Sequence, residues 1–122
     1  MDEILEKSLL FDFYGELLSE HQKEVYSDVV FNDYSLSEVA DSYGISRQGV
    51  HDLIKRCNNT LKGYEEKLKL VEKFLDASNK AKEIMNLADG LCDDMENNKD
   101  KANYKKDITK IKKLAEDMIE DF

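Results

Sequence analysis

The sequence predicts an all-α protein, and three observations support that class. Its 122 residues include no proline and only five glycines, so little interrupts a helix. Charged residues make up 37% of the chain and apolar residues 41%, a balance typical of helices with one face in water. Apolar residues also recur three and four positions apart along most of the chain, which is the helical period.

The first 34 residues predict two helices. Over residues 2–18, apolar residues are so dense that we expect the helix to be largely surrounded by protein. Ser19 is a suitable N-cap for a second helix over residues 20–32, which Asn32 and Asp33 close. Two helices are therefore expected before the most informative part of the chain.

The stretch from Leu36 to Cys57 predicts two short helices joined by a tight turn, the pattern of a helix-turn-helix. Ser35 can cap the first helix while Glu38 reaches back to complete a capping box. Gly44 supplies the left-handed conformation that ends this helix, because glycine adopts it without strain. Ser46 can cap the second helix. An ordinary corner in a helical bundle is the alternative interpretation.

The helix-turn-helix, over residues 35–58, places its candidate binding residues on the exposed face of the second helix. In DNA-binding versions of the motif the start of that helix enters the major groove. Arginine can pair with both acceptors of a guanine edge, glutamine can pair with adenine, and basic side chains a turn or two later reach phosphates. The candidate nucleic-acid-binding residues are Arg47, Gln48, His51, Lys55 and Arg56.

The charge balance argues against strong, general binding of nucleic acid. The formal net charge is −9, so the field of the whole protein repels phosphate. When the chain is divided into residues 1–34, 35–62, 63–99 and 100–122, only residues 35–62, with four bases and three acids, have a net positive charge. Four bases that neutralise about three phosphates would give a salt dependence with a slope of about −3. We therefore expect a single copy to bind duplex DNA weakly.

The recognition helix is expected to continue into a long coiled-coil-like helix. An apolar seam runs from Val50 to Leu75 in alternating steps of four and three. A second seam, from Ala77 to Met95, is out of phase with the first. We therefore expect a kink or a break at residues 76–79, where Ser78 can cap a new helix.

A third seam, from Tyr104 to Phe122, follows a polar stretch at residues 96–103 that is typical of a loop. The last two helices are expected to fold back antiparallel. The chain thus divides into a four-helix unit over residues 1–60 and a helical extension over residues 61–122. Because one hairpin cannot cover three successive seams, we expect a homodimer; packing of the seams on the first unit is the alternative.

No catalytic, metal-binding or cofactor-binding pattern is found in the sequence. The chain has no glycine loop for phosphates and no catalytic residue set with a known spacing, so we expect neither an enzyme nor a cofactor. Cys57 and Cys92 lie on apolar stripes and are expected to be reduced core residues. His21 is expected to be a solvated or capping residue. Without a long apolar run or an export leader, the protein is expected to be cytoplasmic and without a membrane anchor.

Two stretches, FDFYGELLSEHQKEVY and FNDYSLSEVADSYGISRQGVHDLIKR, resemble the YlxM-like proteins. These small bacterial proteins are described as DNA-binding and associated with the signal recognition particle. The resemblance covers residues 9–75, and its helix-turn-helix is also similar to region 4 of bacterial sigma factors. It implies an all-helical fold with DNA-facing positions at Arg47, Gln48, His51 and Lys55, although His51 stands where a tyrosine is expected.

Two functions remain open on these grounds. The first is a regulatory protein that binds DNA as a dimer and takes part in the signal recognition particle pathway, as the resemblance implies. The second is an interaction module in which the same helix docks onto a protein or RNA component of the signal recognition particle. The net charge of −9 favours the second. A stand-alone sigma-like subunit is a weaker interpretation, because no segment resembles the promoter-melting region.

Overall fold

The computed structural model describes residues 2–96 and 102–121, and all regular structure within them is helical, which confirms the all-α class. Two compact units follow one another along the chain, the first reaching Val71 and the second beginning at Glu72. The boundary expected at residue 60 therefore moves to residue 71. Tyr14 of the first helix accepts a hydrogen bond from the Leu70 amide, which ties this part of the chain to the first unit.

The N-terminal segment forms α1 (Glu3–Tyr14) and a single 3-10 turn, η1 (Gly15–Leu17), in place of one helix over residues 2–18. The expectation that protein largely surrounds this segment is wrong. Helix α1 packs mainly on α4, and its other side leaves several large apolar side chains exposed. These exposed residues are Ile4, Leu5, Phe13 and, in η1, Leu17.

Helix α2 (Glu20–Val30) begins at the predicted cap. The Gln22 amide donates to Ser19 Oγ at 3.2 Å, and the Ser19 amide donates to Gln22 Oε1 at 3.1 Å, which completes a capping box. After the helix ends, Asp33 adopts a left-handed conformation with φ of 59°. The chain can therefore turn sharply before the next helix.

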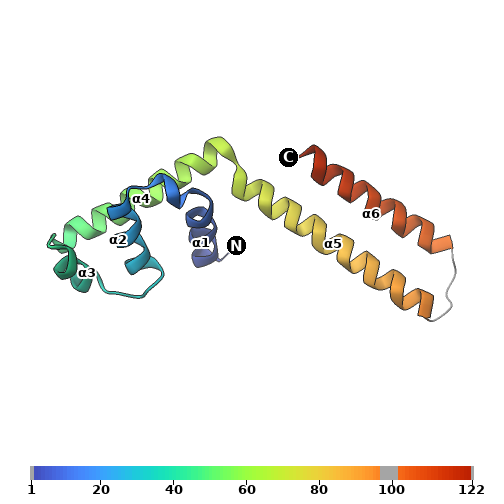
Figure 1. Cartoon of the computed structure of the whole chain (residues 1–122), viewed down its shortest axis with the longest axis horizontal. Helices are drawn as coiled ribbons and strands as arrows, with labels where there is room; N and C mark the ends of the chain where they lie inside the picture. The colour runs from blue at the N-terminus through green and yellow to red at the C-terminus, as the bar shows by residue number, and fades with distance from the viewer. Residues whose placement is uncertain (1, 97–101, 122) are drawn as a thin grey trace. The chain divides into compact units, whose positions relative to one another are not determined.

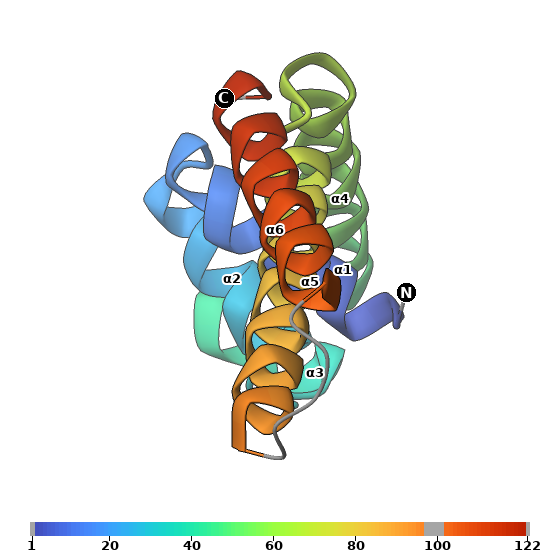
Figure 2. The ribbon, with the colours of Figure 1, turned by 90° about the vertical axis from the view of Figure 1, so that its right-hand side faces the viewer.

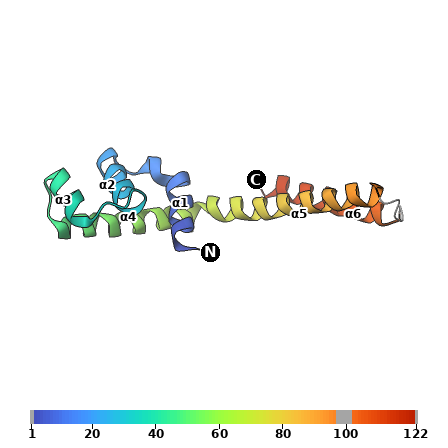
Figure 3. The ribbon, with the colours of Figure 1, turned by 90° about the horizontal axis from the view of Figure 1, so that it is seen from below.

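The predicted helix-turn-helix is confirmed as α3 (Leu36–Tyr43) and the start of α4 (Arg47–Leu68). Ser35 Oγ accepts from the Glu38 amide at 3.1 Å, and Ser46 Oγ accepts from the Gly49 amide at 2.9 Å. Gly44 lies in the left-handed region with φ of 66°. Figures 1 and 3 show α4 running alongside the three shorter helices α1, α2 and α3, all of which it contacts.

Gly44 and Gly63 form a matched pair for testing the turn. A Cβ added at either position would meet no atom within 4 Å, so only the backbone differs between them. Gly44→Ala is expected to lower the free energy of unfolding by about 1–2 kcal/mol, since alanine is strained at positive φ. Gly63→Ala, inside α4, is expected to raise it by about 0.5–1 kcal/mol. Urea unfolding followed by circular dichroism measures both, and equal effects would contradict the role of the turn.

The core of the first unit has an aliphatic part and an aromatic part. The aliphatic part joins α2, α3 and α4 through buried Val25, Val39, Ala40 and Val50. In the aromatic part, the Phe11 ring stacks on the Tyr26 ring with their centroids 5.7 Å apart. Burial of these side chains, at about 1.5–3 kcal/mol for each large one, holds the helix-turn-helix on the rest of the unit.

The long seam expected to continue from α4 is interrupted at Lys69. This residue adopts a left-handed conformation with φ of 58°, and α5 (Leu70–Glu96) begins after it. Tyr14 Oη accepts from the Leu70 amide at 3.1 Å, and Glu65 Oε1 accepts from the Val71 amide at 3.0 Å. Side chains of α1 and α4 thus cap the start of α5. Of the kink or break expected at residues 76–79, the break is wrong, because these residues lie inside α5.

The second unit is an antiparallel hairpin of α5 and α6 (Ala102–Glu120), as predicted (Figures 1 and 2). Lys80 Nζ pairs with Asp121 Oδ2 at 2.8 Å, and Lys110 Nζ pairs with Glu83 Oε1 at 3.0 Å. Of the predicted loop at residues 96–103, residues 97–101 lie outside the described part. Glu96 and Ala102 are helical.

The two cysteines differ in their surroundings. Cys57 is fully buried in the first unit, as predicted, and burial raises the pKa of its thiol. Cys92 is exposed in the single chain, so its assignment to a core within that chain is wrong. It lies on a side of α5 that α6 does not cover.

None of the helices in the described ranges combines the length and apolar character needed to cross a bilayer. Within the same ranges, the histidine, cysteine and carboxylate side chains form no cluster of three that could hold a metal ion.

Candidate nucleic-acid interface

The candidate interface is the exposed start of α4, which the turn at Gly44 presents to solvent. The Ile45 amide donates to the Ala40 carbonyl at 3.1 Å, so the turn closes onto the end of α3. A Cβ at Gly49 would lie 3.1 Å from Ser46 Oγ, which explains why a glycine suits the first turn of α4. The buried Val50 then fixes the rotation of α4, so its opposite face must point outward.

All five residues predicted for the interface are exposed. Arg47, Gln48 and His51 come together with Leu36 of α3 around one shallow hollow. Lys55 lies one turn beyond His51 on the same side of the helix. Arg56 is about 100° further round the helix than Lys55, so it stands apart from the other four. The structure therefore groups four of the predicted side chains and separates the fifth.

Asp52 also lies on this face, and the sequence interpretation gave it no role. Gln48 Nε2 donates to Asp52 Oδ1 at 2.9 Å, and His51 Nδ1 lies 3.6 Å from the same oxygen. The amide of Gln48 therefore already has an acceptor within its own helix. The spacing of four between a glutamine and an aspartate was the signal available in the sequence.

The remaining face of the motif, on α3, offers hydroxyl groups and carboxylates but no base. Ser37, Glu38, Asp41 and Ser42 are all exposed there. In DNA-bound helix-turn-helix proteins the first helix crosses the phosphate backbone. Contacts from α3 to phosphate would therefore rest on hydroxyl groups, with two carboxylates close by.

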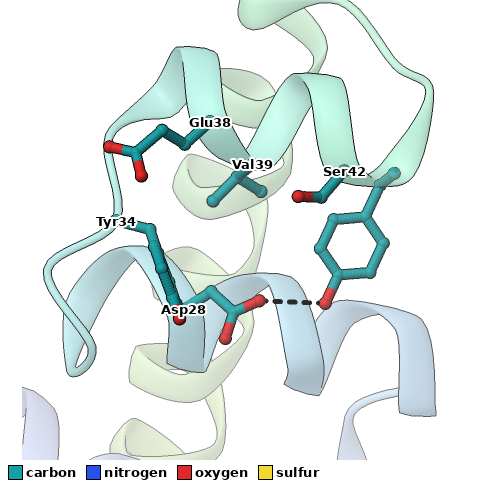
Figure 4. Close-up of a pocket in the computed structure, with 6 residues that line it drawn as sticks. Asp28, Tyr34, Glu38, Val39 and Ser42 are labelled. Atoms are coloured by element: carbon teal, nitrogen blue, oxygen red, sulfur yellow. Dashed lines mark hydrogen bonds between the residues drawn. The ribbon is translucent and has the colours of Figure 1, made fainter.

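A small pocket lies where α3 meets α2, and its lining shares Glu38 and Ser42 with the exposed face of α3 (Figure 4). Tyr43 Oη donates to Asp28 Oδ2 at 2.9 Å, and this bond raises the pKa of Tyr43. Asn32 donates to the other oxygen of Asp28 at 3.2 Å. The carboxylates of Asp28 and Glu38 in the lining disfavour a phosphate. The hydrogen bond between Tyr43 and Asp28 in this pocket links α3 to α2.

Comparison with known proteins places this geometry in a family. A sequence model of the UPF0122 family, described as "Putative helix-turn-helix protein, YlxM / p13 like", matches residues 1–120. The chain is similar to a UPF0122 protein of Acetivibrio thermocellus, with 52% identity over 85 residues, covering 70% of this chain and 73% of that protein. It is also similar to a UPF0122 protein of Clostridium kluyveri, with 43% identity over 95 residues, covering 77% and 85%. The chain therefore belongs to the UPF0122 family of YlxM/p13-like helix-turn-helix proteins.

Proposed function

We propose that this protein is a non-enzymatic regulator that binds duplex DNA as a homodimer, with the start of α4 in the major groove. The grouping of Arg47, Gln48 and His51 around one exposed hollow carries the proposal. Arginine can bond both acceptors of a guanine edge, and glutamine can bond adenine once it leaves Asp52. Replacing the Gln48–Asp52 hydrogen bond with a bond to adenine costs little free energy, because both side chains are exposed to water.

Two copies are required on electrostatic grounds. With Arg47 on a base edge, the remaining bases of residues 35–62 are Lys55, Arg56 and Lys62, so each copy makes at most about three phosphate contacts, and each such module buries only about 600–1,000 Å². A dimer doubles both quantities and reads two half-sites one helical turn apart. The salt dependence of binding is expected to have a slope of about −3 for each bound copy.

The Arg47→Ala, Gln48→Ala double variant tests the proposal. We expect it to bind a selected duplex at least about thirtyfold more weakly than the wild type, because each bidentate base contact contributes about 1–3 kcal/mol. Fluorescence anisotropy over a range of salt concentrations measures the affinity and the slope. Lys67→Ala, an exposed change at the far end of α4, removes a positive charge and serves as the control. Equal binding by the wild type and the double variant would refute the proposal.

The net charge of −9 favours a second candidate function, docking of the same helix onto a protein or RNA component of the signal recognition particle. Asp52 and the carboxylates of α3 point the same way, because they suit a partner with basic side chains. Pull-down from a native lysate, with and without nuclease, separates the two functions. Particle components retained with no preference for any duplex sequence would support docking, whereas an operator-like selected site would support DNA binding.

A further inference from the structure

One face of the α5–α6 hairpin exposes large apolar side chains. Met85 and Met95 of α5 are 64% and 66% exposed, and Ile108 and Ile119 of α6 are 56% and 77% exposed. Surface residues of these types occur singly in most soluble proteins, but a continuous group of them marks an interaction surface. These four side chains form such a group only if they share one face of the hairpin.

Helix α5 carries two apolar seams side by side. Ile84, Leu87 and Leu91 are half-buried, on the side where α5 forms its ion pairs with α6. The second seam lies about a quarter turn around α5 from these residues. Its members are spaced by three, four and three and are all exposed: Met85, Ala88, Cys92 and Met95. We call these four residues the open seam of α5. A helix with two such seams is typical of a bundle in which it has two neighbours.

Helix α6 has the same organisation. Ile111, Leu114 and Met118 are half-buried towards α5, and about a quarter turn away lie Ile108 and Ile119. On both helices the exposed residues are displaced clockwise when each helix is viewed along its own chain direction. Because the two helices are antiparallel, displacements of the same sense place both sets on the same side of the hairpin. The four exposed side chains therefore share one face.

Within the described part of the hairpin, no side chain after Val71 is fully buried. The only buried residue of α5 is Val71, which belongs to the first unit, and the described part of α6 has none. Two helices without a single buried side chain gain too little from burial to offset their conformational entropy. A second layer on the open face would supply the missing core.

The charges on the hairpin select its partner. Residues 83–96 of α5 carry five acids and no base, whereas residues 105–113 of α6 carry five bases and one acid. Residues 114–121 of α6 carry four acids and no base. A second copy of the chain offers the same distribution, so the acidic part of one α5 can lie beside the basic part of the other α6. The reverse orientation would bring the acidic parts of α5 and α6 together.

We propose that a second copy of this chain docks on this face with the hairpin tips at the same end, so that α5 of each copy packs along α6 of the other. The result is a four-helix bundle whose core contains the open seam of α5, with Ile108 and Ile119. This inference deepens the proposed function, because it names the surface that brings two helix-turn-helix motifs together. It can be tested without DNA.

Sedimentation of the full-length chain without DNA gives the first test. The wild type is expected to be a dimer at about 1–100 µM. Met85→Lys is expected to raise the dissociation constant at least about a hundredfold, because the change occurs twice in the core of the bundle. Asn86→Lys, an exposed change on the outer face of the same helix, is the control and is expected to dimerise as the wild type does. A monomeric wild type, or equal constants for both variants, would overturn the proposal.

A charge exchange tests the orientation. One variant carries Asp89→Lys and Asp93→Lys, and the other carries Lys105→Glu and Lys112→Glu, all at exposed positions. Each variant alone is expected to dimerise at least about tenfold more weakly, and their mixture is expected to form heterodimers of wild-type affinity. Equal affinities for the variants alone and mixed would refute the arrangement. The Arg47→Ala, Gln48→Ala variant is expected to remain dimeric, so a failure to bind DNA would leave this result unchanged.

Discussion

Replacing Tyr26 with alanine is expected to lower the free energy of unfolding by about 3–5 kcal/mol, the cost of emptying a large core position. The Tyr26 side chain is fully buried, stacks on Phe11 and donates from its hydroxyl to Asn58 Oδ1 at 2.7 Å. Because domains are stable by only about 5–15 kcal/mol, this single change removes a large share of the total. Urea unfolding followed by circular dichroism provides the measurement.

Tyr26→Phe is the matched control, because it keeps the ring and removes only the hydroxyl. It is expected to cost about 1–2 kcal/mol at neutral pH, since Asn58 loses a partner. Burial raises the pKa of Tyr26 to about 12, so the unfolded state ionises first as the pH rises. The contribution of this pKa difference to the free energy of unfolding is fully present below pH 10. It falls by up to about 2 kcal/mol between about pH 10 and pH 12. If the difference in free energy of unfolding between the wild type and Tyr26→Phe stays constant from about pH 10 to about pH 12, the prediction is contradicted.

The second large effect is expected at Tyr14, which is buried between α1 and the joint of α4 with α5. Tyr14→Ala should also cost about 3–5 kcal/mol. Tyr14→Phe isolates the hydroxyl, which donates to Glu65 Oε1 at 2.5 Å and accepts from the Leu70 amide. Its loss should cost about 1–3 kcal/mol and weaken the support of the left-handed backbone at Lys69, which then rests on the bond from the Val71 amide to Glu65. We expect α4 and α5 to join into one helix in this variant.

Nuclear magnetic resonance can follow the joint directly. The carbon chemical shifts of Lys69 and the coupling between its amide and α protons report its φ angle, which should move from the left-handed to the helical region in Tyr14→Phe. Tyr34→Phe, at an exposed tyrosine, is the control and should change stability by less than about 0.5 kcal/mol. An unchanged Lys69 in Tyr14→Phe would show that other contacts hold the break.

The correct sequence predictions concern features with local causes. Ser19, Ser35 and Ser46 each cap a helix through a bond to an amide three residues ahead, and Gly44 meets a conformational need of its own position. Signals of this kind depend only on residues within about one helical turn of each other. Lys69 is different, because its neighbours in sequence favour a continuous helix. The residue after it, Leu70, is bonded to Tyr14, more than fifty residues earlier in the chain.

The incorrect predictions for α5 also have a physical reason. The change of apolar phase near Ser78 was interpreted as a new helix, but the helix has a second apolar face. Apolar spacing by itself does not distinguish a chain break from a second face. The same ambiguity placed the exposed Cys92 in a core. At the interface, spacing gave the exposed face of α4 but not the bond between Gln48 and Asp52, since that requires the side-chain rotamers.

The bonds at Tyr14 also mean that the first unit is closed as a loop. Its first and last helices are fastened together across 51 residues at Glu65 and 56 at Leu70, and the helix-turn-helix lies wholly within the stretch they enclose. Bringing together residues so far apart in the sequence costs a large amount of conformational entropy. The packing of the whole unit must form together to offset that cost. We therefore expect the unit to fold as a whole. A fragment of residues 35–58 would lack both the bonds at Tyr14 and the packing on α2, so binding studies require the intact chain.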